Sequence, residues 1–189
     1  MKPQGYILAG GYSSRMGRDK GREVVDGTPL VSHIAGAITE SVASVTVIAK
    51  TDGAYSDLGF ATIADKTPDL GPLGGLETAM VDADTPGWVL LAACDWVGVQ
   101  GEWVETLVQA SVPGIHAVAF NDGRWQPLLA LYHTDSLTTV RDHIKEGKRA
   151  MWQVIEAVPN ARLSPPPGWE SAGQINDQAA LAKWRAGNR

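Results

Sequence analysis

Short apolar runs alternate along the chain with longer segments in which apolar residues recur at helical spacing. Runs typical of buried strands cover residues 5–9, 44–49, 60–65, 88–94, 115–120 and 127–132. Segments with helical spacing cover residues 30–42, 76–83, 102–110 and 136–146. Strands that alternate with helices of this length predict an α/β fold, a three-layer α/β/α domain with a mostly parallel sheet.

Two places in this pattern carry more detail. The run 88–94 is apolar on both faces, as a central parallel strand should be, and it stops at Asp95. The runs 115–120 and 127–132 flank an Asn-Asp-Gly turn at residues 121–123, which predicts an antiparallel hairpin. The proline-rich loop at 165–168 has too little chain after it for another domain, so residues 1–189 are expected to form a single domain.

Composition argues against several classes of protein. The chain has 189 residues, 44% of them hydrophobic, which suffices for one sizeable core. Its formal net charge of −5 argues against a nucleic-acid-binding protein. No apolar run approaches the roughly 18 residues that a membrane helix needs, and Cys94, the single cysteine, has no disulfide partner within the chain. We therefore expect a cytoplasmic protein with no membrane partner.

A glycine-rich, basic segment follows the first predicted strand. Gly10 and Gly11 leave room for backbone amides to approach a ligand, because glycine has no Cβ. Arg15 can bind phosphate oxygens with two parallel hydrogen bonds, and Lys20 supplies a compact positive charge. The spacing matches neither the P-loop nor the dinucleotide G-x-G-x-x-G motif. An ordinary turn with a solvated basic face is the alternative, but the combination favours a site for a phosphorylated ligand.

This segment, LAGGYSSRMGRDK at residues 8–20, resembles the signature L-A-G-G-x-S-x-R-M-G-x-D-K of the MobA family, the molybdenum cofactor guanylyltransferases. Other segments of the family have counterparts in the same order: DLGPLGGLETAM, LLAACDWVGV, GRWQPLLALY, EGKRAMWQVI and QINDQAAL. The resemblance implies a Rossmann-like nucleotidyltransferase domain. It also implies transfer of GMP from GTP to the phosphate of molybdopterin, with or without bound molybdenum, and release of pyrophosphate.

The resemblance also assigns roles to particular residues. It places the nucleotide against Leu8, Ala9, Gly10, Gly11, Lys20, Asp65, Gly71, Gly75 and Asp95. Arg149 and Asn176 are assigned to molybdopterin binding. Arg15, Lys20 and Asp95 are the implied catalytic residues, with Asp95 as the ligand of Mg²⁺, a cation that prefers carboxylate oxygen. Proteins that take part in molybdoenzyme maturation are further candidate partners.

Each assignment has a structural alternative. Asp95 could cap the next helix, Asp65 could cap a turn, Arg149 could be a solvated charge at a helix end, and Asn176 could be an N-cap.

Two other functions stay open as well. One is a related nucleotidyltransferase, either an enzyme that uses CTP or a sugar-1-phosphate nucleotidyltransferase. The short chain and Gly10 argue against both, because the absent Cβ of Gly10 leaves room for the larger guanine base. The other is a nucleotide-binding accessory protein without catalysis, since Asp177 and Gln178 replace the Thr-Pro of the family's last motif.

Overall fold

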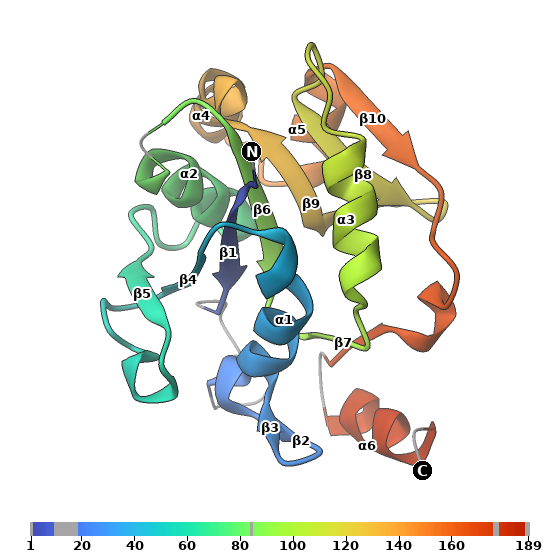
Figure 1. Ribbon diagram of the computed structural model, residues 1–189. Helices are drawn as coiled ribbons and strands as arrows, with labels where there is room; N and C mark the ends of the chain where they lie inside the picture. The colour runs from blue at the N-terminus through green and yellow to red at the C-terminus, as the bar shows by residue number, and fades with distance from the viewer. Residues whose placement is uncertain (1, 10–18, 84, 176–177, 188–189) are drawn as a thin grey trace.

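A seven-stranded sheet forms the centre of the molecule (Figure 1). The computed structural model describes residues 2–9, 19–83, 85–175 and 178–187. The strand order is β10-β8-β9-β6-β1-β4-β5. The strands are β1 (Gln4–Leu8), β4 (Val45–Ala49), β5 (Ala61–Ala64), β6 (Trp88–Ala93), β8 (Ala117–Asn121), β9 (Trp125–His133) and β10 (Asn160–Leu163).

The sheet is mostly parallel, as the sequence predicts. Neighbouring strands pair in parallel except where β9 pairs with β6 and β8. The antiparallel pair of β8 and β9 is the predicted hairpin, and β9 begins two residues earlier than expected, at Trp125. The carboxyl ends of β1 and β6 therefore lie side by side at one edge of the sheet, with Leu8 opposite Ala93.

Helices cover both faces of the sheet, which confirms the three-layer prediction. They are α1 (Leu30–Ile38), α2 (Pro72–Asp82), α3 (Gly101–Gln109), α4 (Leu137–Lys145), α5 (Met151–Ala157) and α6 (Gln178–Gly187). Helices α1 and α3 pack in one apolar cluster, and α2, α4 and α5 pack in another on the opposite face. In β1, Ile7 joins the first cluster and Tyr6 the second, because successive strand residues point to opposite faces. Both faces of the central strands are buried, so these strands read as unbroken apolar runs.

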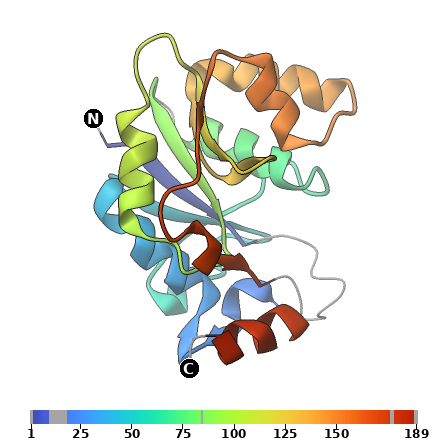
Figure 2. The same cartoon turned by 90° about the vertical axis from the view of Figure 1, so that its right-hand side faces the viewer.

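Short elements lie outside the seven-stranded sheet, most of them where β1 and β6 end, whereas η2 and η4 lie where these two strands begin. They are the 3-10 helices η1 (Lys20–Arg22), η2 (Thr39–Ser41), η3 (Ser56–Leu58), η4 (Thr134–Ser136) and η5 (Trp169–Ser171), and the strand pairs β2 (Val24–Val25) with β3 (Thr28–Pro29) and β7 (Trp96–Val97) with β11 (Gly173–Gln174). A third apolar cluster joins Val25 of β2 to Leu181 of α6. Figure 2 shows α6 beside β2 and β3 at this end of the molecule.

Some boundaries differ from the sequence prediction. The second helix begins at Pro72, so Gly74 and Gly75 lie inside it instead of preceding it. The first helix is α-helical only to Ile38 and continues as η2. The sequence prediction omitted α5 and β10, both of which are short. Within the described part of the chain, no helix has the length and apolar character needed to span a bilayer.

Candidate nucleotide site

An ion pair lies where β1 and β6 end. The amide of Cys94 donates to the carbonyl of Leu8 at 3.1 Å, so the two strand ends are held together. Asp95 follows directly, and the ammonium of Lys20 donates to its Oδ2 at 2.6 Å. The side chains of Lys20 and Asp95 are only 19% and 12% exposed. Charges withdrawn from water in this way need a partner, and each supplies one to the other.

A network around Asp19 holds the turn that carries Lys20. Oδ1 of Asp19 accepts from the amide of Gly21 at 3.1 Å and caps η1. The same oxygen accepts from the hydroxyl of Tyr55, whose side chain is buried. A Cβ at position 21 would collide with that hydroxyl, so the turn requires glycine there. Burial, and then the hydrogen bond to Asp19, raise the pKa of Tyr55, which keeps its phenol protonated.

Arg22 fixes the same turn from its other side. Its guanidinium binds both oxygens of Asp57, at 2.7 and 2.9 Å, and lies 5.0 Å from the centre of the Tyr55 ring. It also donates to the carbonyl of Ala54. These contacts join η1 to η3, so the position of Lys20 is set by residues far from it in the chain. Tyr55, Arg22 and Asp57 were not predicted as site residues, since no motif or periodic pattern in the sequence marks them.

Asp95 does not cap the helix that follows it. The next helix, α3, begins at Gly101 with Gln100 at its N-cap, which contradicts the capping alternative. Oδ1 of Asp95 is buried and accepts no hydrogen bond from the described residues. A buried carboxylate oxygen without a donor is costly unless a cation or water satisfies it. Mg²⁺ prefers such an oxygen, so the residue present fits this cation.

Asp65 is a turn residue at the end of β5. Its Oδ1 accepts from the amide of Thr67 and from the hydroxyl of Thr78, both at 3.0 Å. Its backbone amide donates to the carbonyl of Ala49 at 2.8 Å. The structural alternative for Asp65 is therefore present, and its role beside the nucleoside stays a prediction.

The two glycines of the predicted nucleoside side lie at the beginning of α2. Gly71 has φ 62° and ψ −149°, a backbone conformation open only to glycine, and it is the N-cap. A Cβ on Gly75 would collide with the side chain of Leu8. The structure thus brings Leu8 and Gly75 together, and the amide of Ala9 donates to the carbonyl of Ile48 at 2.9 Å beside them.

Other predicted residues are not brought to this edge by any described contact. Arg149 is exposed, and its guanidinium donates to the carbonyls of Lys148 and Ile144 at the end of α4, as the helix-end alternative holds. Gly10, Gly11, Arg15 and Asn176 lie outside the described residues. Ala9 and Asp19 flank residues 10–18 in the chain. Both lie near the ion pair, because Ala9 follows Leu8, which binds Cys94, and Asp19 precedes Lys20.

Aromatic packing supports the chain that follows Asp95. The Trp169 ring lies 5.4 Å from that of Trp96, 5.2 Å from that of Trp103 and 5.3 Å from that of Phe120. Trp169 lies in η5, directly before β11. Directly after β11, the amide of Ile175 donates to the carbonyl of Asp95 at 2.9 Å. The tryptophans therefore act as packing that holds the backbone of Asp95.

A separate hollow of about 460 Å³ lies beside the β8–β9 hairpin and includes Trp125 and Trp152 in its lining. The indole nitrogen of Trp125 donates to Glu156 at 3.1 Å, and the guanidinium of Arg162 lies 4.7 Å from its ring centre. One face of Trp125 is thus covered by a cation.

Comparison with known proteins agrees with this architecture. A family model described as the MobA-like NTP transferase domain matches residues 5–162. The molybdenum cofactor guanylyltransferase of Yersinia pestis (strain Pestoides F) is 30% identical over 188 residues, which cover 98% of this chain and 96% of that protein. The crystal structure of molybdopterin-guanine dinucleotide biosynthesis protein A from Archaeoglobus fulgidus superposes with a TM-score of 0.79 at 18% identity, over 97% of both chains.

A CTP-bound enzyme has the same fold. The structure of CMP:2-keto-3-deoxy-manno-octonic acid synthetase complexed with CTP superposes with a TM-score of 0.75 at 15% identity, over 98% of both chains. At such identities the two solved structures show the fold alone, so the fold does not select the base. The family model and the full-length relative go further: this chain belongs to the MobA-like NTP transferase family and is a nucleotidyltransferase.

Proposed function

We propose that this enzyme transfers GMP from GTP to the terminal phosphate of molybdopterin and releases pyrophosphate. The observation that carries the proposal is the contact between Lys20 and Asp95, which gathers one cation and one buried carboxylate where β1 and β6 end. The name of the Yersinia relative supports the choice of nucleotide and acceptor.

The reaction joins two anions, so neutralisation of charge is its main requirement. An oxygen of the acceptor phosphate attacks the α-phosphorus of GTP in line, a new P–O–P bond forms, and the bond between the α-phosphorus and the α–β bridging oxygen breaks. The positive charge of Lys20 stabilises the negative charge that develops on the phosphate oxygens. Its ammonium is already in position, because Asp19 and Arg22 fix the turn that carries it. No protein nucleophile is needed; burial raises the pKa of the Cys94 thiol to about 12, so this neighbour stays neutral.

Asp95 would hold the cation of this reaction. Oδ1, which is buried and has no donor among the described residues, is the atom suited to Mg²⁺. When bound, Mg²⁺ supplies positive charge beside the phosphate oxygens. Lys20 then has phosphate as an alternative partner to the carboxylate, so the ion pair is a resting arrangement that nucleotide binding can exchange.

Guanine selection depends on the first strand end. Leu8 packs against Gly75, and the chain continues through Ala9 towards the glycines. A glycine at position 10, where cytidylyltransferases commonly have alanine, leaves space for a purine. This supports GTP over CTP as the donor.

The test is a reconstituted reaction of the full chain with molybdopterin, molybdate, Mg²⁺ and each of GTP, CTP and ATP. We expect pyrophosphate release and a guanine-containing dinucleotide product only with GTP. A thermal-shift titration with the same nucleotides measures binding alone. A preference for CTP would overturn the base assignment, and GTP binding without product would favour the accessory-protein alternative.

A further inference from the structure

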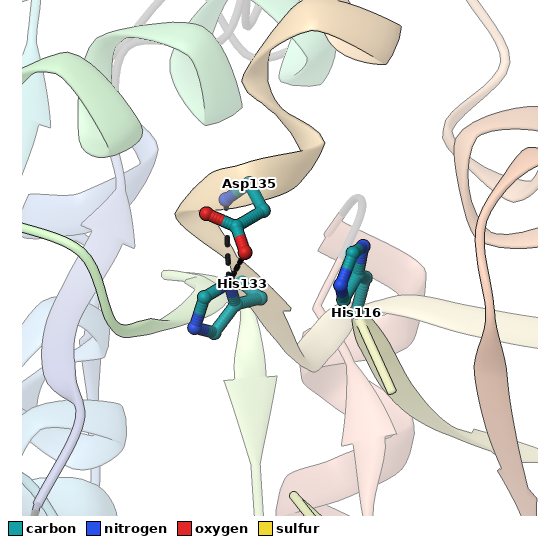
Figure 3. A group of neighbouring side chains, drawn as sticks. All are labelled: His116, His133 and Asp135. Carbon is teal, nitrogen blue, oxygen red and sulfur yellow. Dashed lines mark hydrogen bonds and ion pairs between the residues drawn. The ribbon is translucent and has the colours of Figure 1, made fainter. Parts of the chain in front are cut away.

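Three metal-ligating side chains meet at the edge of the sheet opposite Asp95. His116 directly precedes β8, His133 ends β9, and Asp135 lies in η4. Figure 3 shows His116 beside His133, with the carboxylate of Asp135 next to His133. One possible ligand atom from each residue lies within 4.8 Å of the other two. We propose that His116, His133 and Asp135 bind one divalent cation of the Zn²⁺ class.

The backbone holds the two histidines in place without any metal. The amide of His133 donates to the carbonyl of His116 at 2.9 Å, across the β8–β9 pair. The same carbonyl accepts from the hydroxyl of the buried Ser136 at 3.3 Å, and the amide of His116 donates to the carbonyl of Pro159 at 2.7 Å. Ligands fixed in this way lose little freedom on binding, which favours affinity.

The spacing is close to that of a zinc site. Nδ1 of His133 lies 3.2 Å from Oδ2 of Asp135. Zn–N and Zn–O bonds of about 2.0–2.2 Å in tetrahedral geometry put neighbouring ligand atoms about 3.4 Å apart. The three candidate ligand atoms all lie within 4.8 Å of one another, so no separation has to close by more than about 1.4 Å. The Asp135 side chain is 59% exposed and can supply part of this movement.

Binding has one local cost. The amide of Asp135 donates to Nδ1 of His133 at 3.3 Å, and a metal at that nitrogen replaces this bond. A hydrogen bond of this length is a weak one, so the exchange favours the metal.

The ligand types select the cation. Two imidazoles and one carboxylate suit Zn²⁺, Co²⁺ or Ni²⁺, whereas Mg²⁺ prefers oxygen alone. The rings of His116 and His133 are stacked, with centres 5.6 Å apart and planes at 23°. The ring of Trp88 contacts His133 edge-on at 5.2 Å and covers one side of the site.

The site is separate from the nucleotide site. His133 pairs with Trp88, the first residue of β6, and Asp95 comes seven residues later, just beyond the end of that strand. At about 3.3 Å per residue these seven residues span about 23 Å, which separates the two sites. The cation thus joins the start of β8, the end of β9 and η4 as a structural cross-link, and its binding does not depend on the proposed function.

Calorimetric titration of the untagged full chain, stripped of metal with EDTA and dialysed, tests the proposal. We expect one Zn²⁺ per chain and, at a free Zn²⁺ concentration 100 times the Kd, a rise in Tm of about 5–10 °C. Replacing the ligands with His116→Gln or Asp135→Asn should lower the affinity at least tenfold. The matched controls His33→Gln and Asp142→Asn should bind as the unmodified chain does.

Two further measurements keep the result unambiguous. Asp135 is exposed, so Asp135→Asn should keep the Tm of the metal-free protein and isolates the loss of binding from a loss of folding. Co²⁺ in place of Zn²⁺ should give visible absorption bands in the unmodified chain that disappear in Asp135→Asn. Equal Zn²⁺ affinity in all variants, or no stoichiometric binding, would overturn the site; the response to GTP and Mg²⁺ should be unchanged in either case.

Discussion

Lys20 and Asp95 are 75 residues apart in the chain, yet the ammonium of one lies 2.6 Å from a carboxylate oxygen of the other. Both side chains are largely withdrawn from solvent. The second oxygen of Asp95 is buried without a donor among the described residues. One oxygen of the Asp95 carboxylate is thus paired with an ammonium, and the other has no hydrogen-bond donor among the described residues. This arrangement suits an exchange in which the carboxylate binds a cation and the Lys20 ammonium binds a triphosphate.

Lys20→Met should lower turnover at least about 100-fold, because the charge that stabilises the phosphate oxygens is removed. The Tm should fall by only about 2–4 °C, since Asp95 can take up a cation in place of the ammonium. Steady-state kinetics of pyrophosphate release and a thermal melt measure the two effects. Lys145→Met, at an exposed lysine of α4, is the control and should leave both values unchanged. Normal turnover in Lys20→Met would exclude the residue from the site.

Asp95→Asn should abolish the part of GTP binding that depends on Mg²⁺. Asparagine has nearly the same shape but no charge, so it is a poor ligand for this cation. The rise in Tm produced by GTP should become the same with and without Mg²⁺, whereas the unmodified chain should show a larger rise with the metal. Asp142→Asn on α4 controls for the loss of one negative charge. A Mg²⁺ effect that survives in Asp95→Asn would assign the cation to other residues.

Much of the fold follows from local patterns that the sequence displays. The run that becomes β6 is apolar on both faces and ends at Asp95, so its central position and the location of the carboxylate could be predicted. The Asn-Asp-Gly turn similarly indicates the hairpin of β8 and β9. Helix α5 has only seven residues, and β10 is a half-exposed edge strand with Arg162 in it, so neither presents a clear period.

The support of the site could not be predicted, because it depends on long-range contacts between loops. The hydroxyl of Tyr55 reaches Asp19 over 36 residues, and Arg22 reaches Asp57 over 35. No periodic pattern marks such partners, and each residue alone is compatible with an ordinary surface loop. Lys20 could be identified because it lies in a glycine-rich basic segment that also matches a family signature, whereas the residues that hold it lie outside that segment or show no such pattern.

Gly75→Ala should weaken GTP binding about tenfold while costing less than about 2 kcal/mol of stability. The new methyl group meets the end of the Leu8 side chain, which can rotate away, but Leu8 is then displaced from the predicted base site. Isothermal titration with GTP and urea unfolding measure the two effects. Gly36→Ala in α1 is the matched control: it is exposed, meets nothing within 4 Å and should stabilise the helix by up to about 1 kcal/mol. Unchanged GTP affinity in Gly75→Ala would remove Leu8 from base binding.

Tyr55→Phe should lower kcat about tenfold, since the turn that carries Lys20 loses its buried hydrogen bond to Asp19. The stability cost should be about 1 kcal/mol, as for one hydrogen bond. Tyr132→Phe is the control, because its hydroxyl donates to the carbonyl of Pro127 at 2.8 Å, away from Lys20. That variant should lose similar stability and keep its kcat. Equal kcat in both variants would show that Tyr55 does not position the lysine.

Stability should decrease steeply above pH 10. Burial, assisted in two of the three cases by a hydrogen bond to an aspartate, raises the pKa values of Tyr6, Tyr55 and Tyr132 above the usual 10. Between the unfolded and folded pKa values the unfolded chain has released these protons and the folded chain has not, so rising pH favours unfolding. Each phenol should remove about 1.4 kcal/mol per pH unit, or about 4 kcal/mol per unit for the three together. Urea unfolding from pH 8 to 11 measures the slope, which Tyr132→Phe should reduce by a third; a free energy of unfolding that stays constant up to pH 11 would show that the phenols ionise normally in the folded protein.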